Sequence, residues 1–304
     1  MRRSLVWIAS LFVCVNGSAQ LIFQEDFNYP DGPLLTAPNS PWESDRTPSN
    51  QVDVVSGELF LTQTEQESVR YELPATFAEG SRTASFNLRV TALPNGNGNW
   101  FAYFRASASA YLGRVWITNG TVEGTYRLGV VTINESAVLI PVDLSIGDTH
   151  TVVLRLVVDQ GLYTSTLWVD PVSETDMERR ADHSYYIGPG YVHAYFGFKQ
   201  VSPGLDNPAN GMGELFLDNL RIGHVFNDVM PLRFTSLTRL DNGGVHLLGA
   251  GTAGTTYDVL VTTDLSSTDW LTIGSATADS NGVIDFIDAG AVDRPVSFYR
   301  LAPQ

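Results

Sequence analysis

The sequence predicts an all-β protein, an antiparallel sandwich or jelly roll, and three observations carry this prediction. Long helical periodicity is hard to find anywhere after the N-terminal segment. Short runs that alternate apolar and polar residues dominate instead, and clusters of Gly, Pro, Asn and Asp separate them. The hydrophobic fraction of 43% over 304 residues is enough for one large core or two ordinary ones.

Residues 1–19 are predicted to be a secretory signal peptide. Two arginines precede the apolar run 5–15, and small residues at 17–19 offer a cleavage site after Ala19. The run is too short to anchor the chain in a membrane. The only cysteine, Cys14, lies inside it, so the exported chain would form no disulfide and would depend on a large core. We therefore expect a bacterial protein that is secreted or on the cell surface, with no membrane span after signal cleavage.

The region 20–226 is expected to form the larger sandwich, because its runs alternate as strands with one buried face do. Segments 94–99 and 203–211 are loops by composition, and 174–182 is the one candidate for a short helix. The predicted strands are 59–63, 68–73, 83–90, 100–106, 113–118, 126–133, 149–158, 164–169, 194–200 and 214–222.

One pentapeptide, GELFL, occurs twice in this region, at 57–61 and at 213–217. Nothing outside the five letters matches, so a repeat architecture, which needs a sustained period, is not indicated. Each copy has a glycine that ends a turn and then an alternating run. We interpret the two copies as one local solution used twice to begin a strand.

A linker is expected at 227–231, after which 232–304 repeat the strand pattern on a smaller scale. The spacing is typical of a small sandwich, and the Asn-Gly pair at 281–282 predicts a hairpin turn. The predicted strands are 233–240, 245–249, 256–262, 270–276, 282–288 and 296–301.

Three segments of the first region resemble a known family. The opening FQEDFNYPDG at 23–32, the turn and strand VSGEL at 55–59 and the closing LDNLRIG at 217–223 resemble concanavalin A-like lectin/glucanase domains of the LamG jelly-roll type in secreted bacterial proteins. This resemblance implies two curved sheets packed face to face. Such a fold hosts lectins, glycan-binding modules, glycosidases and lyases, so it does not choose among functions.

The C-terminal segments resemble a small β-sandwich that is commonly appended to exported proteins, notably of the verrucomicrobial kind. They are YDVLVTTDL at 257–265, Trp270, the Asn-Gly pair, and FYRL at 298–301. The resemblance concerns fold and leaves the purpose of this part open.

The net charge of −15 makes nucleic acid an unexpected partner, because phosphate binding needs a basic field. Lys199 is the only lysine, so arginine supplies nearly all the positive charge. The position of each arginine is therefore informative.

No catalytic residue is predicted. A retaining glycosidase needs two carboxylates about 5 Å apart, and the nearest candidates, Glu214 and Asp218, have Phe216 between them and lack a third acid. Fragments reminiscent of polysaccharide lyases occur at 70–73 and 195–200, but the Gln-x-His strand expected with them is missing. The histidines are scattered, without the spacing of a metal site or a triad.

A structural calcium ion is predicted where the first and last strands of the larger sandwich would pair. Hard cations take several oxygen ligands, and Glu25, Asp26 and Asp218 stand in those terminal strands, with Asn219 as a further oxygen. In the alternative, Asp218 and Asn219 merely end or bulge a strand while the two N-terminal acids are solvated.

Arginines and aromatic residues form the most suggestive pattern. On alternation, Phe101 shares a face with Tyr103 and Arg105, and Leu112 shares one with Arg114 and Trp116. The arginines at 89, 127 and 155 are out of phase with the apolar residues of their strands.

The predicted ligand-binding residues are taken from this pattern. If these side chains lie on one concave sheet, the aromatic rings would offer flat surfaces for sugar rings. The arginines would offer forked donors for carboxylate or sulfate groups. In the alternative, the arginines solubilise an exposed sheet and pair with acids. The predicted residues are Tyr103, Arg105, Arg114, Trp116 and Arg127.

The sequence thus predicts a secreted, non-catalytic protein that binds an extracellular polysaccharide, with anionic glycans among the candidates. A glycoside hydrolase or polysaccharide lyase on a jelly-roll fold is the alternative. A structural surface or matrix protein without glycan binding is the third reading.

Overall fold

The computed structural model describes residues 21–46, 50–106, 110–133, 135–171, 173–200, 210–230, 232–251, 254–266, 269–279, 282–294 and 296–304. The predicted signal peptide and most of the predicted loop 203–211 lie outside these residues, as does Asn281 of the predicted hairpin. None of the helices among the described residues is long and apolar enough to cross a membrane.

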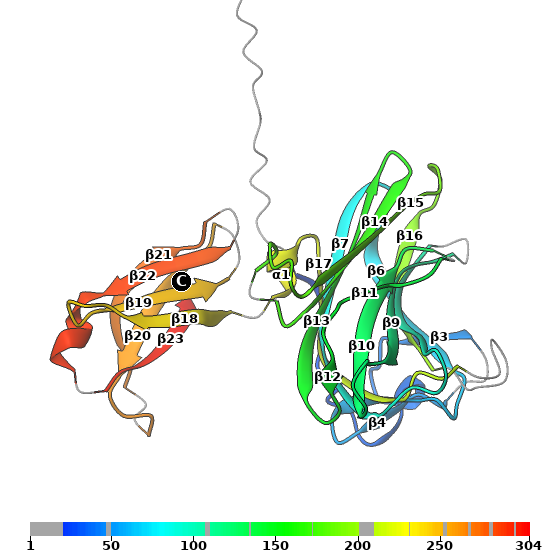
Figure 1. Ribbon diagram of the computed structural model, residues 1–304, viewed down its shortest axis with the longest axis horizontal. Coiled ribbons are helices and arrows are strands. Elements are labelled where there is room, and N and C mark those ends of the chain that lie inside the picture. Colours follow the sequence, from blue (N-terminus) through cyan, green and yellow to red (C-terminus); the bar gives the residue numbers. More distant parts are fainter. Residues whose placement is uncertain are drawn as a thin grey trace, which may run out of the picture.

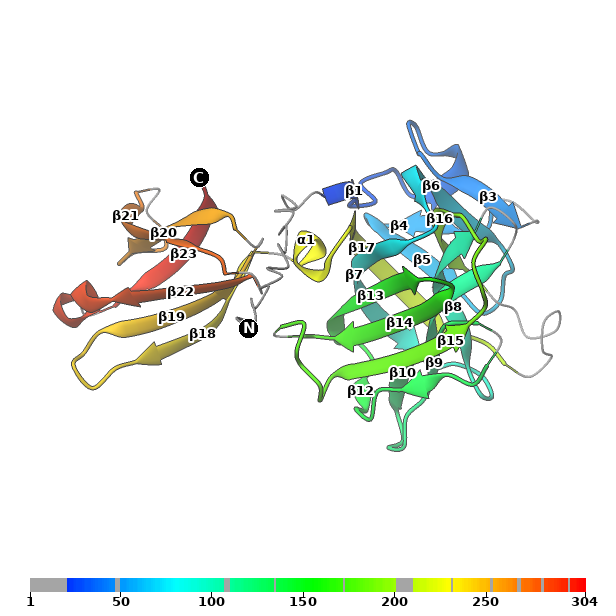
Figure 2. The same ribbon diagram turned by 90° about the horizontal axis from the view of Figure 1, so that it is seen from above.

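The larger part of the chain forms two antiparallel sheets that pack face to face, as Figures 1 and 2 show. The nine-stranded sheet, called sheet A, has the order β15-β14-β13-β7-β17-β5-β4-β2, and β1 pairs with β17. Its strands are β1 Leu21–Glu25, β2 Gly32–Pro33, β4 Asp53–Val55, β5 Glu58–Thr62, β7 Gly80–Ala92, β13 Thr149–Asp159, β14 Leu162–Val169, β15 Arg180–Tyr186 and β17 Glu214–Gly223.

The eight-stranded sheet, called sheet B, has the order β11-β10-β9-β8-β16-β6-β3, and β12 pairs with β10. Its strands are β3 Glu43–Arg46, β6 Ser68–Phe77, β8 Asn99–Ala106, β9 Tyr111–Asn119, β10 Thr125–Val131, β11 Val138–Leu139, β12 Leu144–Ser145 and β16 His193–Lys199. A short 3₁₀ helix, η1 Leu34–Thr36, follows β2.

The main core lies between sheets A and B. Phe86 of β7 contacts Phe101 and Phe198 of sheet B edge to face, with ring centroids 6.1 and 5.6 Å apart. All three rings are almost completely buried. A cluster of this size replaces the disulfides that the chain lacks, because burial of apolar area is the main favourable contribution to folding.

The two GELFL segments are hydrogen-bonded neighbours in sheet A. They run antiparallel, so that Phe60 stands opposite Phe216 and each leucine opposite a leucine. The leucines are buried in the core, and the centroids of the two phenylalanine rings lie 4.8 Å apart on the face of sheet A that is turned away from the core. Gly57 and Gly213 have φ of 81° and 84°, which confirms that a turn glycine precedes each strand.

The remaining strands form a smaller sandwich of two three-stranded sheets, ordered β18-β19-β22 and β21-β20-β23. Its apolar centre includes Tyr257, Ala278 and Ile284. The strands are β18 Arg233–Arg239, β19 Val245–Ala250, β20 Thr256–Thr262, β21 Leu271–Thr277, β22 Val283–Asp288 and β23 Phe298–Pro303, with the 3₁₀ helix η2 Ala289–Asp293 after β22. The predicted fold class, an all-β jelly-roll sandwich followed by a smaller sandwich, is confirmed.

One local expectation fails. The helix predicted at 174–182 is absent, because the segment forms turns and then enters β15 at Arg180. The predicted linker 227–231 contains most of the short helix α1 Phe226–Val229. Phe226 packs edge to face on Trp168 of sheet A, with ring centroids 5.0 Å apart, so this segment belongs to a second small apolar cluster.

Candidate functional site

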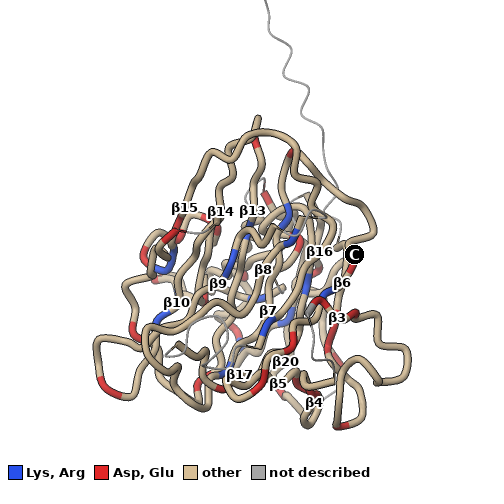
Figure 3. Tube along the Cα trace, turned by 90° about the vertical axis from the view of Figure 1, so that its right-hand side faces the viewer, with Lys and Arg blue, Asp and Glu red and all other residues tan. Residues whose placement is uncertain are grey.

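The candidate site is the face of sheet B that is turned away from sheet A, called here the outer face. In antiparallel strands, residues that stand directly opposite one another lie on the same face. Arg105 stands opposite both Tyr195 and Tyr111, and Trp100 stands opposite Trp116. The residues that alternate with them, such as Phe104 and Phe196, point into the core. Figure 3 shows Lys and Arg positions on several of these strands.

Two irregularities in the pairing of β8 with β9 make the observed alternation of side chains differ from the one predicted from the sequence. Phe101 and Leu112 are fully buried in the core and do not share a face with Arg105 and Arg114. The pairing of β8 with β9 shifts between Trp100 and Ala102 and again between Ala102 and Phe104. A bulge adds one residue to a strand and therefore reverses the alternation beyond it.

The bulges also bring a residue to the outer face that sequence reasoning missed. Trp100 lies there, with its ring centroid 5.4 Å from Tyr103 and 5.2 Å from Tyr111. Gly113 at the second shift has φ of 55°, a left-handed conformation that favours glycine. The outer face therefore carries a group of aromatic side chains around the ends of β8 and β9.

One buried carboxylate neutralises the cations on the β3 side of the face. The side chain of Asp45 has no exposed surface and forms ion pairs with Arg70 and Arg105. The hydroxyl of Tyr103 donates to the same carboxylate at 2.7 Å. Burial and the neighbouring Asp45 charge raise the pKa of Tyr103 well above its usual value. Arg70 also lies on the ring of Tyr195, 4.2 Å from its centroid.

Three of the predicted ligand residues are buried or already have partners within the chain. Tyr103 is fully buried, so it supports the face from beneath and offers no surface to a ligand. Arg105 is occupied by Asp45. Arg127, on β10, is occupied as well, because its Nε donates to Asp143 at 2.5 Å and its Nη2 donates to Thr121 at 3.0 Å.

Arg114 differs from these arginines. It is 7% exposed, and no described residue forms a hydrogen bond or an ion pair with its side chain. Its Nε is buried without a partner. Burial lowers the pKa of Arg114 to about 10, so the guanidinium stays charged at neutral pH. Its Cζ lies 5.3 Å from the ring centroid of Trp100.

Lys199, the only lysine, contacts the same indole from β16, which neighbours β8 on the side away from β9. Its Nζ is 4.0 Å from the ring centroid of Trp100, and the residue is 5% exposed. Trp116, two residues beyond Arg114 on β9, is half-buried, and its indole N–H donates to the carbonyl of Asn97 at 3.3 Å. This group, Arg114, Trp100, Lys199 and Trp116, is called the Arg114 cluster below.

The sequence did hold a signal for Lys199 and Tyr195. They lie in the lyase-like fragment 195–200, and alternation along β16 places both on the outer face, where Tyr195 stands opposite Glu72 of β6. Gln200 of the same fragment is buried, and its side-chain oxygen accepts from the backbone N–H of Thr62 at 2.7 Å. Gln200 therefore has a structural task.

Two arginines of the original pattern lie elsewhere. Arg89 and Arg155 belong to sheet A and pair with Glu58 and Glu174. Arg89 also lies 4.3 Å from the ring centroid of Phe216. They follow the alternative in which surface arginines pair with acids.

The residues predicted for calcium all accept hydrogen bonds, Asp218 from the backbone and the side-chain amide of Asn219. Both carboxylate oxygens of Glu25 accept hydrogen bonds, from the N–H of Phe27, the hydroxyl of Tyr29 and the indole N–H of Trp42. Asp26 accepts from Gln24. Among the described residues, no group of three or more His, Cys, Asp or Glu could hold a metal ion. Calcium at this place stays a prediction.

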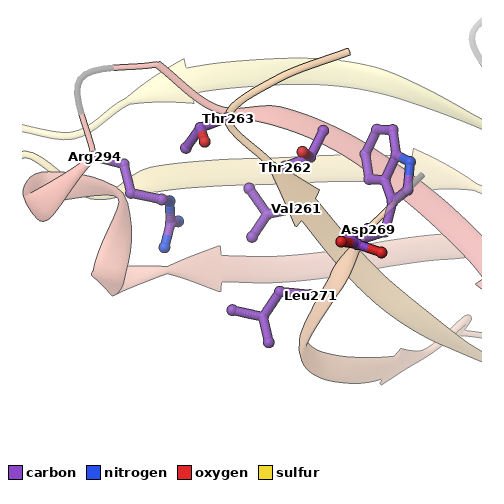
Figure 4. A pocket seen from close by; sticks show the side chains of 7 residues that line it. Val261, Thr262, Thr263, Asp269, Leu271 and Arg294 are labelled. Atoms are coloured by element: carbon purple, nitrogen blue, oxygen red, sulfur yellow. The ribbon is translucent and has the colours of Figure 1, made fainter. Parts of the chain in front are cut away.

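A separate depression lies on the smaller sandwich (Figure 4). It has a volume of about 380 Å³ and is lined by residues that include Val261, Trp270 and Leu271. Arg294 at its rim is paired with Asp288, which also accepts the hydroxyl proton of Tyr299 at 2.8 Å. Arg294 is thus neutralised, in contrast to Arg114.

The protein is thus a β-sandwich protein with a cluster of cations and indoles on one sheet. No family model matches the chain, and no curated protein matches it in sequence.

Solved structures of similar architecture exist. A putative β-glucanase from Mycobacterium abscessus has 17% identity and a TM-score of 0.39, covering 67% of this chain and 100% of its own. Basic winged bean lectin with Tn-antigen has 13% identity and a TM-score of 0.39, covering 66% and 97%. An alginate lyase from Chlorella virus has 10% identity and a TM-score of 0.38, covering 68% and 100%. The ligand and the activity must therefore be argued from the site.

Proposed function

We propose that this chain is a secreted, non-catalytic polysaccharide-binding protein whose ligand lies across the outer face of sheet B. The observation that carries the proposal is the Arg114 cluster, in which half-buried tryptophans of neighbouring strands lie beside cations. Flat aromatic surfaces suit the apolar faces of sugar rings, and the rigid strands hold them in place.

Binding is favoured over hydrolysis by the state of the acids on this face. A glycosidase needs one carboxylate as acid and another as nucleophile or base. Asp45 is buried beneath its donors, and Glu43 is paired with Arg70 at 3.2 Å. Both are therefore already engaged as ion-pair partners, and the exposed Glu72 opposite Tyr195 would supply only one of the two carboxylates that hydrolysis needs.

Export is part of the proposal and rests on the predicted signal peptide at 1–19. The bacterial chain should be cleaved after Ala19 and reach the extracytoplasmic space. Sequencing the N-terminus of protein recovered from the medium or cell surface tests this directly. A start at Met1 would reject it.

The binding proposal is tested by electrophoresis in gels that contain alginate, carrageenan or laminarin, with reducing-end and 235 nm assays run beside them. We expect retardation in at least one gel and no product. Trp116→Ala should remove the retardation. Trp270→Ala is the matched control, because Trp270 is also half-buried but belongs to the smaller sandwich.

Three outcomes separate the functional classes. Retardation lost only in Trp116→Ala supports a binder at this face. Reducing ends or 235 nm absorbance that rise with time would identify an enzyme and reject the proposal. Unchanged mobility in every gel would reject glycan binding and favour the hypothesis of a structural surface protein.

A further inference from the structure

Arg114 is the arginine of the outer face for which the described chain provides no carboxylate. Arg70 and Arg105 share Asp45, and Arg127 has Asp143. Arg114 has no such partner, although its side chain is more deeply buried than that of any of those three.

An unpaired buried cation costs stability. Removing a charge from water is unfavourable unless a counter-charge or hydrogen bonds compensate it. Here the compensation within the described chain is limited to the indole of Trp100, because the buried Nε makes no hydrogen bond. A site that holds a residue at such a cost is a candidate for binding, because a ligand can supply the missing partner.

The neighbours of Arg114 indicate what that ligand carries. The guanidinium of Arg114 is a cation without a carboxylate partner among the described residues, so the ligand group should be anionic. Trp116 is two residues further along β9 on the same face, which corresponds to about 7 Å along a strand. A sugar ring on Trp116 would thus bring one of its substituents next to the guanidinium.

The charge of the whole chain makes this local arrangement necessary. With a net charge of −15, the protein repels a polyanion at long range, so general electrostatic attraction cannot account for binding. Contact with an acidic polymer must come from a specific site.

We propose that the Arg114 cluster is an anion subsite that selects an acidic polysaccharide, with the guanidinium of Arg114 receiving the carboxylate or sulfate of one sugar unit. This inference rests on the proposed function and names its ligand class. The planar guanidinium offers parallel N–H donors that match either group.

The main test replaces Arg114 by Met, which fills a similar volume without charge. Retardation by acidic polymers should weaken roughly 10- to 100-fold in affinity, because a charge-assisted hydrogen bond is lost. The melting temperature of the ligand-free variant should stay unchanged or rise, because an unpaired buried charge is removed. A structural arginine would give the opposite result, a lower melting temperature.

Arg105→Met is the matched control on the same face. It removes a paired arginine and leaves Asp45 short of a cation, so its melting temperature should fall.

The polymer panel distinguishes carboxylate from sulfate ligands. It also separates failure of the subsite from failure of the proposed function. Polygalacturonate and alginate carry carboxylates, carrageenan carries sulfates, and laminarin is neutral. Wild-type binding to acidic polymers alone, lost in Arg114→Met, supports the subsite and identifies the group. Equal binding of laminarin, or full binding by Arg114→Met, overturns the subsite while the proposed function stands. No retardation by any polymer overturns the proposed function itself.

Discussion

His193 should make the larger sandwich sensitive to mild acid. It begins β16, is completely buried and has no hydrogen-bond partner on either ring nitrogen. Its ring lies 4.7 Å from that of Phe77 and 5.6 Å from that of Tyr163, measured between centroids. Burial in this apolar setting lowers the pKa of His193 from 6.5 to about 4.

The sign and size of the effect follow from linkage. The folded-state pKa lies below the unfolded one, so the native state prefers the neutral ring and protonation favours unfolding. The contribution of His193 is fully present above the unfolded pKa of 6.5 and is lost as the pH falls toward 4. At about 1.4 kcal/mol per pKa unit, the full loss is about 3 kcal/mol, of which about 2 kcal/mol falls between pH 7 and pH 5.

Urea unfolding at pH 7 and pH 5, followed by tryptophan fluorescence, measures this difference. His193→Leu should lose about 2 kcal/mol less than the wild type between the two pH values, because it has no proton to gain. His246→Leu is the control, because His246 is partly exposed beside Asp285 in the smaller sandwich. An equal loss of stability in His193→Leu and the wild type would refute the reasoning.

Three further predictions concern buried carboxylates and the metal. Asp45→Asn should lower the free energy of unfolding by about 3 kcal/mol or more, seen as a lower urea midpoint, because Arg70 and Arg105 lose their shared counter-charge. Glu67→Gln should lower the free energy of unfolding by about 2 kcal/mol in the same assay. The fully buried carboxylate of Glu67 accepts hydrogen bonds from the backbone N–H groups of residues 50–52 at 2.7 to 2.9 Å, and an amide would turn its own donors toward them. Melting temperatures in calcium and in EDTA should be equal, because the carboxylate of Glu25 is already engaged, and a rise of several degrees in calcium would restore the metal assignment.

Alternation predicted the strands that have one buried and one solvated face. The run 149–158 became β13 Thr149–Asp159, and the strands of the smaller sandwich begin within two residues of their predicted starts. The strands that were missed have no such pattern. In β15, for instance, only Ala181 is buried, so the sequence there looks polar throughout.

The partners of the arginines could not be predicted, because they depend on which strands are neighbours. Asp45 and Arg105 are 60 residues apart in sequence and meet only because both lie on the outer face of sheet B. Local periodicity gives the face of a side chain and leaves its neighbours undetermined. For this reason the five predicted ligand residues could not be separated into paired and unpaired ones.

The two bulges explain both the error in phase and the existence of the site. With strict alternation, Trp100 would point the same way as Ala102 and Phe104, which is into the core. Arg114 would likewise follow Leu112 inward. The extra residues near Phe101 and Gly113 reverse the phase, so that the core keeps its apolar side chains while an indole and an unpaired guanidinium turn outward. The Arg114 cluster therefore depends on both bulges.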